Sequence, residues 1–293
     1  FVGGSAVWRR VDGSNRLVPP LEGRSLVFPN GNVLTPGSRL VQRDLARSLS
    51  LIAAKGANAF YRGSIADSLV ADMQRGGGII TKADLANYTP VWRTPIKSTY
   101  RGYTLFTMPP ASSGGITMTE SLNVLENFAP LPPFGSTKYV HLLTESYRRA
   151  FTDRNQTLGD PAFIKNPVDK LISKSYAKSL AAQIEPSRAS KTAAFNAGVE
   201  PIHTTHYSVV DAKGNAVATT TTLNGGFGSG VWVRGGGFFM NNEMDDFAAQ
   251  PGSPNMFGLV QGESNAIQPG KRMLSAMSPT IRPGQPGKLL RVT

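Results

Sequence analysis

The chain has 293 residues, of which 40% are hydrophobic and 17% charged, a composition typical of a folded globular protein. The net charge is +12, but the basic residues are scattered and nothing exceeds pairs such as Arg148-Arg149, so a solvated basic surface is favoured over a nucleic-acid site. The absence of cysteine excludes disulfides, thiolate metal sites and a cysteine nucleophile, and no apolar run approaches the roughly 18 residues of a membrane span.

The two ends of the chain suggest a piece of a longer protein. The first residue is Phe1, and FVGGSAVWRR lacks the charged-then-apolar pattern of a signal peptide. The last residues, KLLRVT, have the character of a strand interrupted in mid-course. We therefore expect the chain to be a fragment.

The first two thirds of the chain have a mainly helical pattern. Residues 1–37 are rich in glycine, proline and polar turn formers, and the polar stretch 186–203 is typical of an exposed linker. Residues 91–107 alternate and predict two strands around a turn at Arg101-Gly102. Helices are predicted over about 40–55, 63–75, 82–88, 116–128, 137–156 and 167–183.

After residue 203 the pattern changes to strands. THYSVVD and NAVATTTTL predict a hairpin through the turn AKG, and GGFFMNN predicts a third strand. The sequence therefore predicts a helix-rich part, 1–203, followed by a strand-rich part, 204–293, an order that favours a layered α+β fold.

Several familiar motifs are incomplete. The glycine cluster GGFGSG lacks the spacing of a dinucleotide cradle and predicts a turn. Glu243, Asp245 and Asp246 resemble ligands for a hard cation, but they lack the spacing of an EF-hand. His206 could serve a serine triad, but no GxSxG elbow supports one. His141 falls in an amphipathic helix, where a packed or surface histidine is the favoured interpretation.

The threonines that open the hairpin leave two interpretations. A threonine at the start of a chain can use its own α-amine as a base, because that amine has a pKa near 8. An internal threonine acquires this amine only if the preceding peptide bond is cut, and the linker that ends before Thr204 is a plausible place for a cut. The alternative is that Thr204 and Thr205 are β-branched residues that begin a strand, and the residues alone favour it.

Longer motifs, in order along the chain, change this balance. They are YRGYTLFTMPPASSGG, LGDPAFI, TTHYSVVDAKGNAVATTTTLNGGFGSG, FFMNNEMDDFA and PGSPNMFGLVQGESNAIQPGKRMLSAMSPTI. With them, essentially the whole chain resembles the γ-glutamyltransferase family. The resemblance implies an N-terminal nucleophile hydrolase with a four-layered αββα sandwich, of which this chain would form part. It also implies a precursor that cuts itself into large and small subunits. Residues 1–203 would be the C-terminal part of the large subunit and 204–293 the N-terminal part of the small catalytic subunit, intertwined in one domain.

The resemblance also assigns roles to individual residues. The cut would fall between His203 and Thr204, and Thr204 would then be the catalytic nucleophile. Thr222 matches a second threonine that orients the nucleophile. The residues that match the binding groups for the α-amino and α-carboxylate ends of a γ-glutamyl donor are Asn224, Glu243, Asp246 and Ser275.

Three departures from the family pattern accompany this resemblance. Ser275-Ala276 stands where many members have two serines, which removes one hydrogen bond to the donor carboxylate. The lid segment PGSPNMFGLVQG has Phe257 where some bacterial members have a tyrosine. A carboxylate-binding arginine would lie before Phe1 and two oxyanion-hole glycines after Thr293, so we expect the 293-residue polypeptide alone to be inactive or poorly folded.

The resemblance implies no metal and no organic cofactor. It implies small-molecule substrates such as glutathione, amino acid or peptide acceptors, a large/small subunit heterodimer from one precursor, and a periplasmic or extracellular location. A cephalosporin acylase or a poly-γ-glutamate depolymerase of the same superfamily is the alternative enzyme. A non-catalytic basic binding module is less compatible with the sequence. Such a module would not require the acidic segment NNEMDD together with the Thr204/Thr222 pair.

Overall fold

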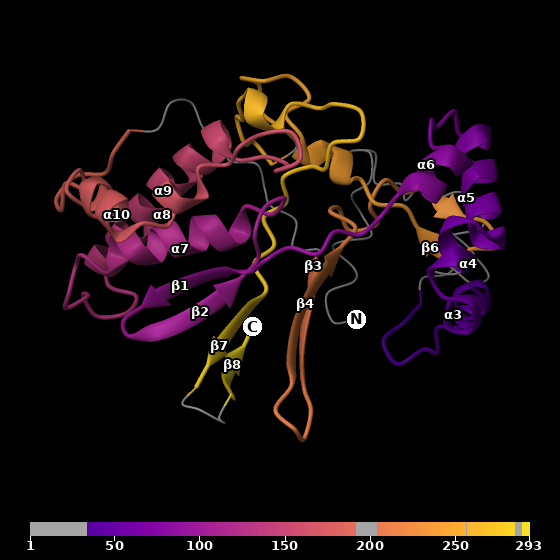
Figure 1. The fold of residues 1–293 in the computed structure, drawn as a ribbon, viewed down its shortest axis with the longest axis horizontal. Helices are drawn as coiled ribbons and strands as arrows, with labels where there is room; N and C mark the ends of the chain where they lie inside the picture. Colours follow the sequence, from indigo (N-terminus) through magenta and orange to yellow (C-terminus); the bar gives the residue numbers. More distant parts are fainter. Residues whose placement is uncertain (1–33, 192–203, 256, 285–288) are drawn as a thin grey trace. The chain divides into compact units, whose positions relative to one another are not determined.

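The computed structural model describes residues 34–191, 204–255, 257–284 and 289–293 (Figure 1). The chain divides into two compact units, each of which draws on segments from both sides of residue 203. The described part of the first unit comprises residues 34–92 and 222–242, and the second unit contains the remainder. Among the described helices, none has the length and apolar character needed to cross a bilayer. The α+β class is confirmed, whereas the boundary of the two subunits at residue 203 stays a prediction.

The first unit pairs short helices with a small ribbon. Its elements are α3 (Arg43–Lys55), α4 (Ala57–Tyr61), α5 (Ser64–Arg75), α6 (Lys82–Asn87), β5 (Trp232–Val233) and β6 (Phe238–Phe239). The helix predicted to stop at Gly56 does so, and Thr81 and Asp84 form a capping box at the start of α6. The strand predicted for GGFFMNN is confirmed only at Phe238–Phe239.

The second unit holds a four-stranded antiparallel sheet and its covering helices. The sheet order is β1 (Ile96–Tyr100), β2 (Tyr103–Thr107), β7 (Thr280–Pro283), β8 (Leu289–Val292). Helices α7 (Gly114–Leu125), α8 (Thr137–Thr157), α9 (Val168–Leu171) and α10 (Lys174–Ala181) follow β2. Helix α7 packs on β1, and α8 and α10 pack on α7 (Figure 1). The same unit contains η2 (Glu243–Asp246) and η3 (Glu263–Asn265).

One predicted helix proved wrong. The pattern over 167–183 indicates a single helix, but the structure has two, α9 and α10, separated at Ile172 and Ser173. The hydroxyl of Ser173 accepts a hydrogen bond from the backbone N–H of Tyr176 at 3.2 Å, which makes Ser173 the N-cap of a new helix. A serine inside an apolar periodicity can therefore start a helix as well as continue one.

Two apolar clusters hold the second unit together. One lies between α7, α8 and α10 and includes Val124, Leu142 and Leu180. The other joins Ile96 of β1 and Ile116 of α7 to residues from α9, the end of α8 and Leu274. The second cluster places the backbone around residue 274 against the N-terminal end of α7, where the candidate site described below begins.

A buried carboxyl group, that of Glu120, lies near the half-buried Asp153. Glu120 of α7 is fully buried, and neither of its oxygens accepts a hydrogen bond from a described residue. Burial raises the pKa of Glu120 to about 9, nearby Asp153 of α8 raises it too, and Lys170 acts in the opposite direction. The hydroxyl of Tyr176 donates to Asp153 at 2.7 Å. At neutral pH Glu120 is therefore protonated.

We expect Glu120→Gln to stabilise the protein at pH 8 and to be nearly neutral at pH 5. The folded state keeps the Glu120 proton up to about pH 9, whereas the unfolded chain releases it near pH 4.5. Stability from this group is therefore complete below pH 4.5 and declines as the pH rises, by at most about 1.4 kcal/mol per pH unit. Urea unfolding of both proteins at pH 5 and pH 8 measures the difference.

Glu145 of α8 is the matched control, because it is equally buried but its pKa shifts the other way. Burial raises its pKa, but hydrogen bonds from Ser190 and Arg149 outweigh burial and lower the pKa to about 2. Its contribution is present above pH 4.5 and is lost as the pH falls toward 2. Glu145→Gln should therefore destabilise the protein at both pH values. A Glu120→Gln protein that is no more stable than the parent at pH 8 would contradict this interpretation.

Candidate active site

The hairpin predicted around DAKGN is present and carries both site threonines at its open end. Thr204 is the first described residue of β3 (Thr204–Val210), and Thr222 is the last residue of β4 (Ala216–Thr222). The two strands form a two-stranded sheet, and His206 Nδ1 lies 2.8 Å from the hydroxyl of Thr220. Thr204 is exposed to solvent, as are all residues of β3. His203, and with it the predicted cleavage bond, lies outside the described residues.

The segment after Thr222 turns sharply and is held by Asn242. The backbone N–H of Asn224 donates to the Thr222 hydroxyl oxygen at 2.8 Å. Asn224 has φ +71°, a left-handed conformation that asparagine tolerates better than most residues. Its side-chain amide donates to the Asn242 carbonyl at 3.3 Å, and the Asn242 side chain accepts from Gly225 N–H at 2.7 Å. Asn242 thus fixes the turn that carries Asn224.

Asn242 was missed by the sequence reasoning. The signal that could have found it is the Asn-Asn pair that opens NNEMDD, since consecutive asparagines beside a glycine-rich turn often hydrogen-bond to the backbone. Asn242 holds the turn at Asn224, and it also lies directly before Glu243, the first acid of the acidic segment.

The acidic segment forms the short helix η2. Glu243 is buried, and burial followed by the charge of Asp246 raises the pKa of Glu243 to about 7. The backbone carbonyl of Asp246 accepts hydrogen bonds from the amides of Gln261 at 3.0 Å and Asn265 at 2.7 Å. In the described ranges, no group of three His, Cys, Asp or Glu side chains is placed to hold a metal ion. The two acids thus share one short, well-supported segment.

Ser275 lies against the loop that precedes α7. Its carbonyl accepts from the N–H of Ser113 at 2.8 Å and from the Ser113 hydroxyl at 2.7 Å, while its N–H donates to the Ala111 carbonyl at 3.1 Å. The hydroxyl of Ser112 donates to the Met277 carbonyl at 2.6 Å. The predicted loop MPPASSGG is thus the support on which the predicted carboxylate-binding serine rests.

Gly114 permits this close approach. A Cβ atom at Gly114 would lie 2.5 Å from the Ala276 carbonyl oxygen and 2.4 Å from that of Met277. Any side chain would therefore force the backbone around Ser275 away from α7. Gly114, the first glycine of SSGG, is required because the start of α7 and the segment after Ser275 approach each other too closely for a side chain.

Phe257 belongs to a local turn. Its N–H and that of Leu259 both donate to the Asn255 side-chain oxygen at 3.0 Å. The role of Phe257 in a lid stays a prediction.

These features can be compared with known proteins. Residues 6–290 match the family model described as gamma-glutamyltranspeptidase. The chain belongs to this family. It is 50% identical over 261 residues to the glutathione hydrolase proenzyme of Pseudomonas sp. (strain A14). The matched region covers 87% of this chain and 45% of that protein. It is 48% identical over 263 residues to the glutathione hydrolase proenzyme of Escherichia coli (strain K12), covering 88% of this chain and 45% of that protein.

A solved structure supports the same fold. The cephalosporin acylase from Bacillus halodurans matches with a TM-score of 0.73 at 28% identity, over 88% of this chain and 45% of that one. The fold is of the N-terminal nucleophile hydrolase type, as the resemblance implies. This chain spans about half the length of the curated relatives that it matches.

Proposed function

We propose that the full-length protein is a self-processing γ-glutamyltransferase and glutathione hydrolase in which Thr204 is the nucleophile. The observation that carries this proposal is the pairing of the exposed strand β3 with β4, which places Thr204 and Thr222 at the same end of the hairpin. The partner strand ends at Thr222, directly before the turn that carries Asn224. The family membership and the proenzyme names of the relatives support the same proposal.

Cleavage before Thr204 supplies the missing base. The new α-amine accepts the proton of the Thr204 hydroxyl while the oxygen attacks the γ-carbonyl carbon of the donor. The tetrahedral intermediate then collapses, the C–N bond breaks, and the amine returns the proton to the leaving group. Water or an amino acid amine attacks the resulting γ-glutamyl ester, which releases glutamate or a new γ-glutamyl amide.

The binding groups divide between the two ends of the donor. Glu243, Asp246 and Asn224 would bind the α-ammonium group, since carboxylates give charge-assisted hydrogen bonds to a cation. Ser275 would bind the α-carboxylate with one hydroxyl, because Ala276 offers none. The expected partners are a γ-glutamyl donor, an acceptor, and the complementary subunit from the same precursor. The expected location is periplasmic or extracellular, as in the family.

The experiment is a substrate panel on the full-length protein. A γ-glutamyl anilide, glutathione, poly-γ-glutamate and a glutaryl-cephalosporin are compared by kcat/KM. We expect the first two to be turned over best. Turnover of the glutaryl-cephalosporin alone, or of poly-γ-glutamate alone, would overturn the proposal.

The second candidate, a cephalosporin acylase, has one specific observation in its favour. Ala276 removes a hydroxyl from the predicted carboxylate site, which would suit a donor that lacks the α-amino-acid end. The match to a solved cephalosporin acylase is compatible with it. The acids Glu243 and Asp246 argue against it, since a glutaryl group has no ammonium to bind.

We expect kcat/KM for a γ-glutamyl donor to rise with pH through about 7. Burial and Asp246 raise the pKa of Glu243 to about 7, and only the ionised carboxylate attracts the donor ammonium. The Glu243→Gln variant should lose this rise and fall about 10- to 100-fold at pH 8. A pH profile of both proteins checks this, and a remaining rise near pH 8 would belong to the Thr204 amine. An unchanged rise near pH 7 in Glu243→Gln would refute the assignment.

A further inference from the structure

Arg154 is a buried cation that no role above accounts for. It lies on α8 with 3% of its surface exposed. The hydrogen bonds of its guanidinium to described residues go to uncharged groups of Ser113, Asn155 and Leu274. Burying a charged guanidinium is costly, so this position requires a compensating set of contacts.

Two of the contacts of Arg154 lead to the candidate site. Its Nε donates to the Ser113 hydroxyl at 3.2 Å, and its Nη2 donates to the Leu274 carbonyl at 3.2 Å. Its Nη1 donates to the side chain of Asn155 at 2.9 Å. Ser113 in turn donates twice to the carbonyl of Ser275. The guanidinium thus holds both the residue before Ser275 and the serine that Ser275 rests on.

A second path connects the same backbone to Asp246. The N–H of Leu274 donates to the side-chain oxygen of Asn265 at 3.1 Å, and the amide of Asn265 donates to the Asp246 carbonyl at 2.7 Å. Asn265 is fully buried. Leu274 is therefore fixed on one side by Arg154 and on the other by the residue that supports η2.

Arg154 also acts on Asp246 through its charge. Burial lowers the pKa of Arg154 to about 10, and the negative charge of Asp246 opposes this shift. Arg154 therefore stays charged at neutral pH, and its charge and that of Asp246 attract each other.

We propose that Arg154 is a positioning residue that sets the spacing of the two donor-binding groups, Ser275 for the α-carboxylate and Asp246 for the α-ammonium. The inference rests on the proposed function. A planar guanidinium can reach three acceptors on three segments at once, whereas the single ammonium of lysine is a point charge on a flexible stem. Lysine at this position would keep the positive charge, but it would not hold Ser275 and Asp246 at the same spacing.

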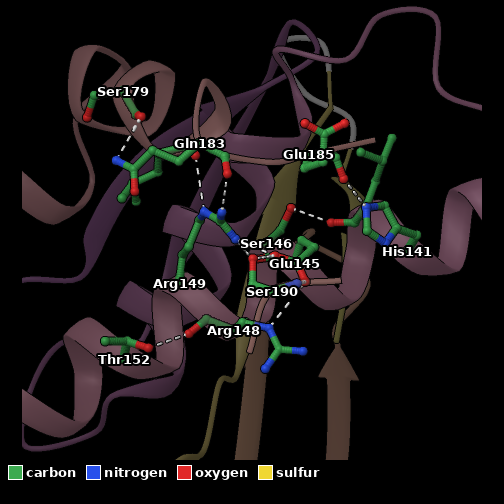
Figure 2. A network of polar contacts seen from close by, with 12 residues as sticks. His141, Glu145, Ser146, Arg148, Arg149, Thr152, Ser179, Gln183, Glu185 and Ser190 are labelled. Atoms are coloured by element: carbon green, nitrogen blue, oxygen red, sulfur yellow. Dashed lines mark hydrogen bonds and ion pairs between the residues drawn. The ribbon is translucent and has the colours of Figure 1, made fainter. Parts of the chain in front are cut away.

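The test compares Arg154→Lys and Arg154→Met with a control on the same helix. Figure 2 shows Arg149, whose guanidinium donates to the carbonyls of Leu180, Gln183 and Glu145 and to the Glu145 carboxylate at 2.6 Å. Arg149→Met thus removes a similar number of hydrogen bonds from α8 without touching Ser113 or Leu274. All variants are made in the full-length protein and assayed with a γ-glutamyl anilide.

We expect both Arg154 variants to be cut before Thr204 and to show a KM about 10- to 100-fold higher, with kcat changed less, because lost positioning of binding groups weakens donor binding. Arg149→Met should lower the melting temperature and leave KM unchanged. An unchanged KM in Arg154→Lys overturns the inference, and so does an equal KM increase in Arg149→Met. If neither Arg154 variant folds, the role of Arg154 is structural and the inference is likewise wrong. If the parent protein fails to turn over the anilide, the proposed function fails instead.

Discussion

Replacing Thr204 by alanine is expected to give a protein that remains a single uncut chain and has no measurable γ-glutamyl transfer. Under the proposed mechanism one hydroxyl performs both reactions, so its removal eliminates both together. Loss of a nucleophile in comparable hydrolases costs at least about 10⁴-fold in rate. Denaturing gels and donor turnover measure the two effects in one preparation.

The next residue offers a matched control. Thr205 is also an exposed β-branched residue of β3. Thr205→Ala should therefore be cut and active, and Thr204→Ser should retain both reactions at a reduced rate, because serine keeps the hydroxyl. Normal cleavage of Thr204→Ala, or loss of cleavage in Thr205→Ala alone, would show that the nucleophile is misassigned.

Gly114→Ala is expected to have the second-largest effect, a loss of about 3 kcal/mol or more of folding stability together with loss of activity. The new methyl group would meet the carbonyl oxygens of Ala276 and Met277 at 2.5 and 2.4 Å, and these are backbone atoms, which cannot move aside as the end of a flexible side chain can. The Ser275 backbone would have to move away from Ser113, so the substitution would displace a predicted donor-binding residue directly.

Gly262→Ala is the control for this substitution. Gly262 belongs to the same unit and has φ −88°, and a Cβ there would meet nothing closer than 3.7 Å. Thermal unfolding of both variants should show a large drop for Gly114→Ala and a small one for Gly262→Ala. Equal melting temperatures would mean that the α7 loop does not hold the Ser275 segment in the way described.

Local patterns predicted the elements well because local chemistry determines them. The capping box of Thr81 and Asp84 starts α6, Gly56 ends α3, and the Asp211 turn closes the β3–β4 hairpin through hydrogen bonds to Lys213 and Asn215. Each of these signals lies within five residues of the structure it specifies. The break at Ser173 was missed because a serine serves equally well as a helix surface residue and as an N-cap.

The support of the site could not be predicted in the same way. Arg154 acts on Ser113 and on Leu274, which lie 41 and 120 residues away in the sequence. No periodicity or short motif links such positions, since their proximity follows from the packing of α7 and α8 over the sheet. The site threonines and acids were found because long family motifs contain them, whereas their mutual placement in an assembled active site stays a prediction.

The central claim is that the chain is cut at one bond, and the mass of the fragments tests it most directly. The full-length protein is purified, and its denatured fragments are analysed by intact mass and N-terminal sequencing. We predict a smaller fragment that begins Thr204-Thr205-His206-Tyr207. A folded protein that turns over γ-glutamyl donors as one uncut chain, or that is cut at another bond, would contradict the account.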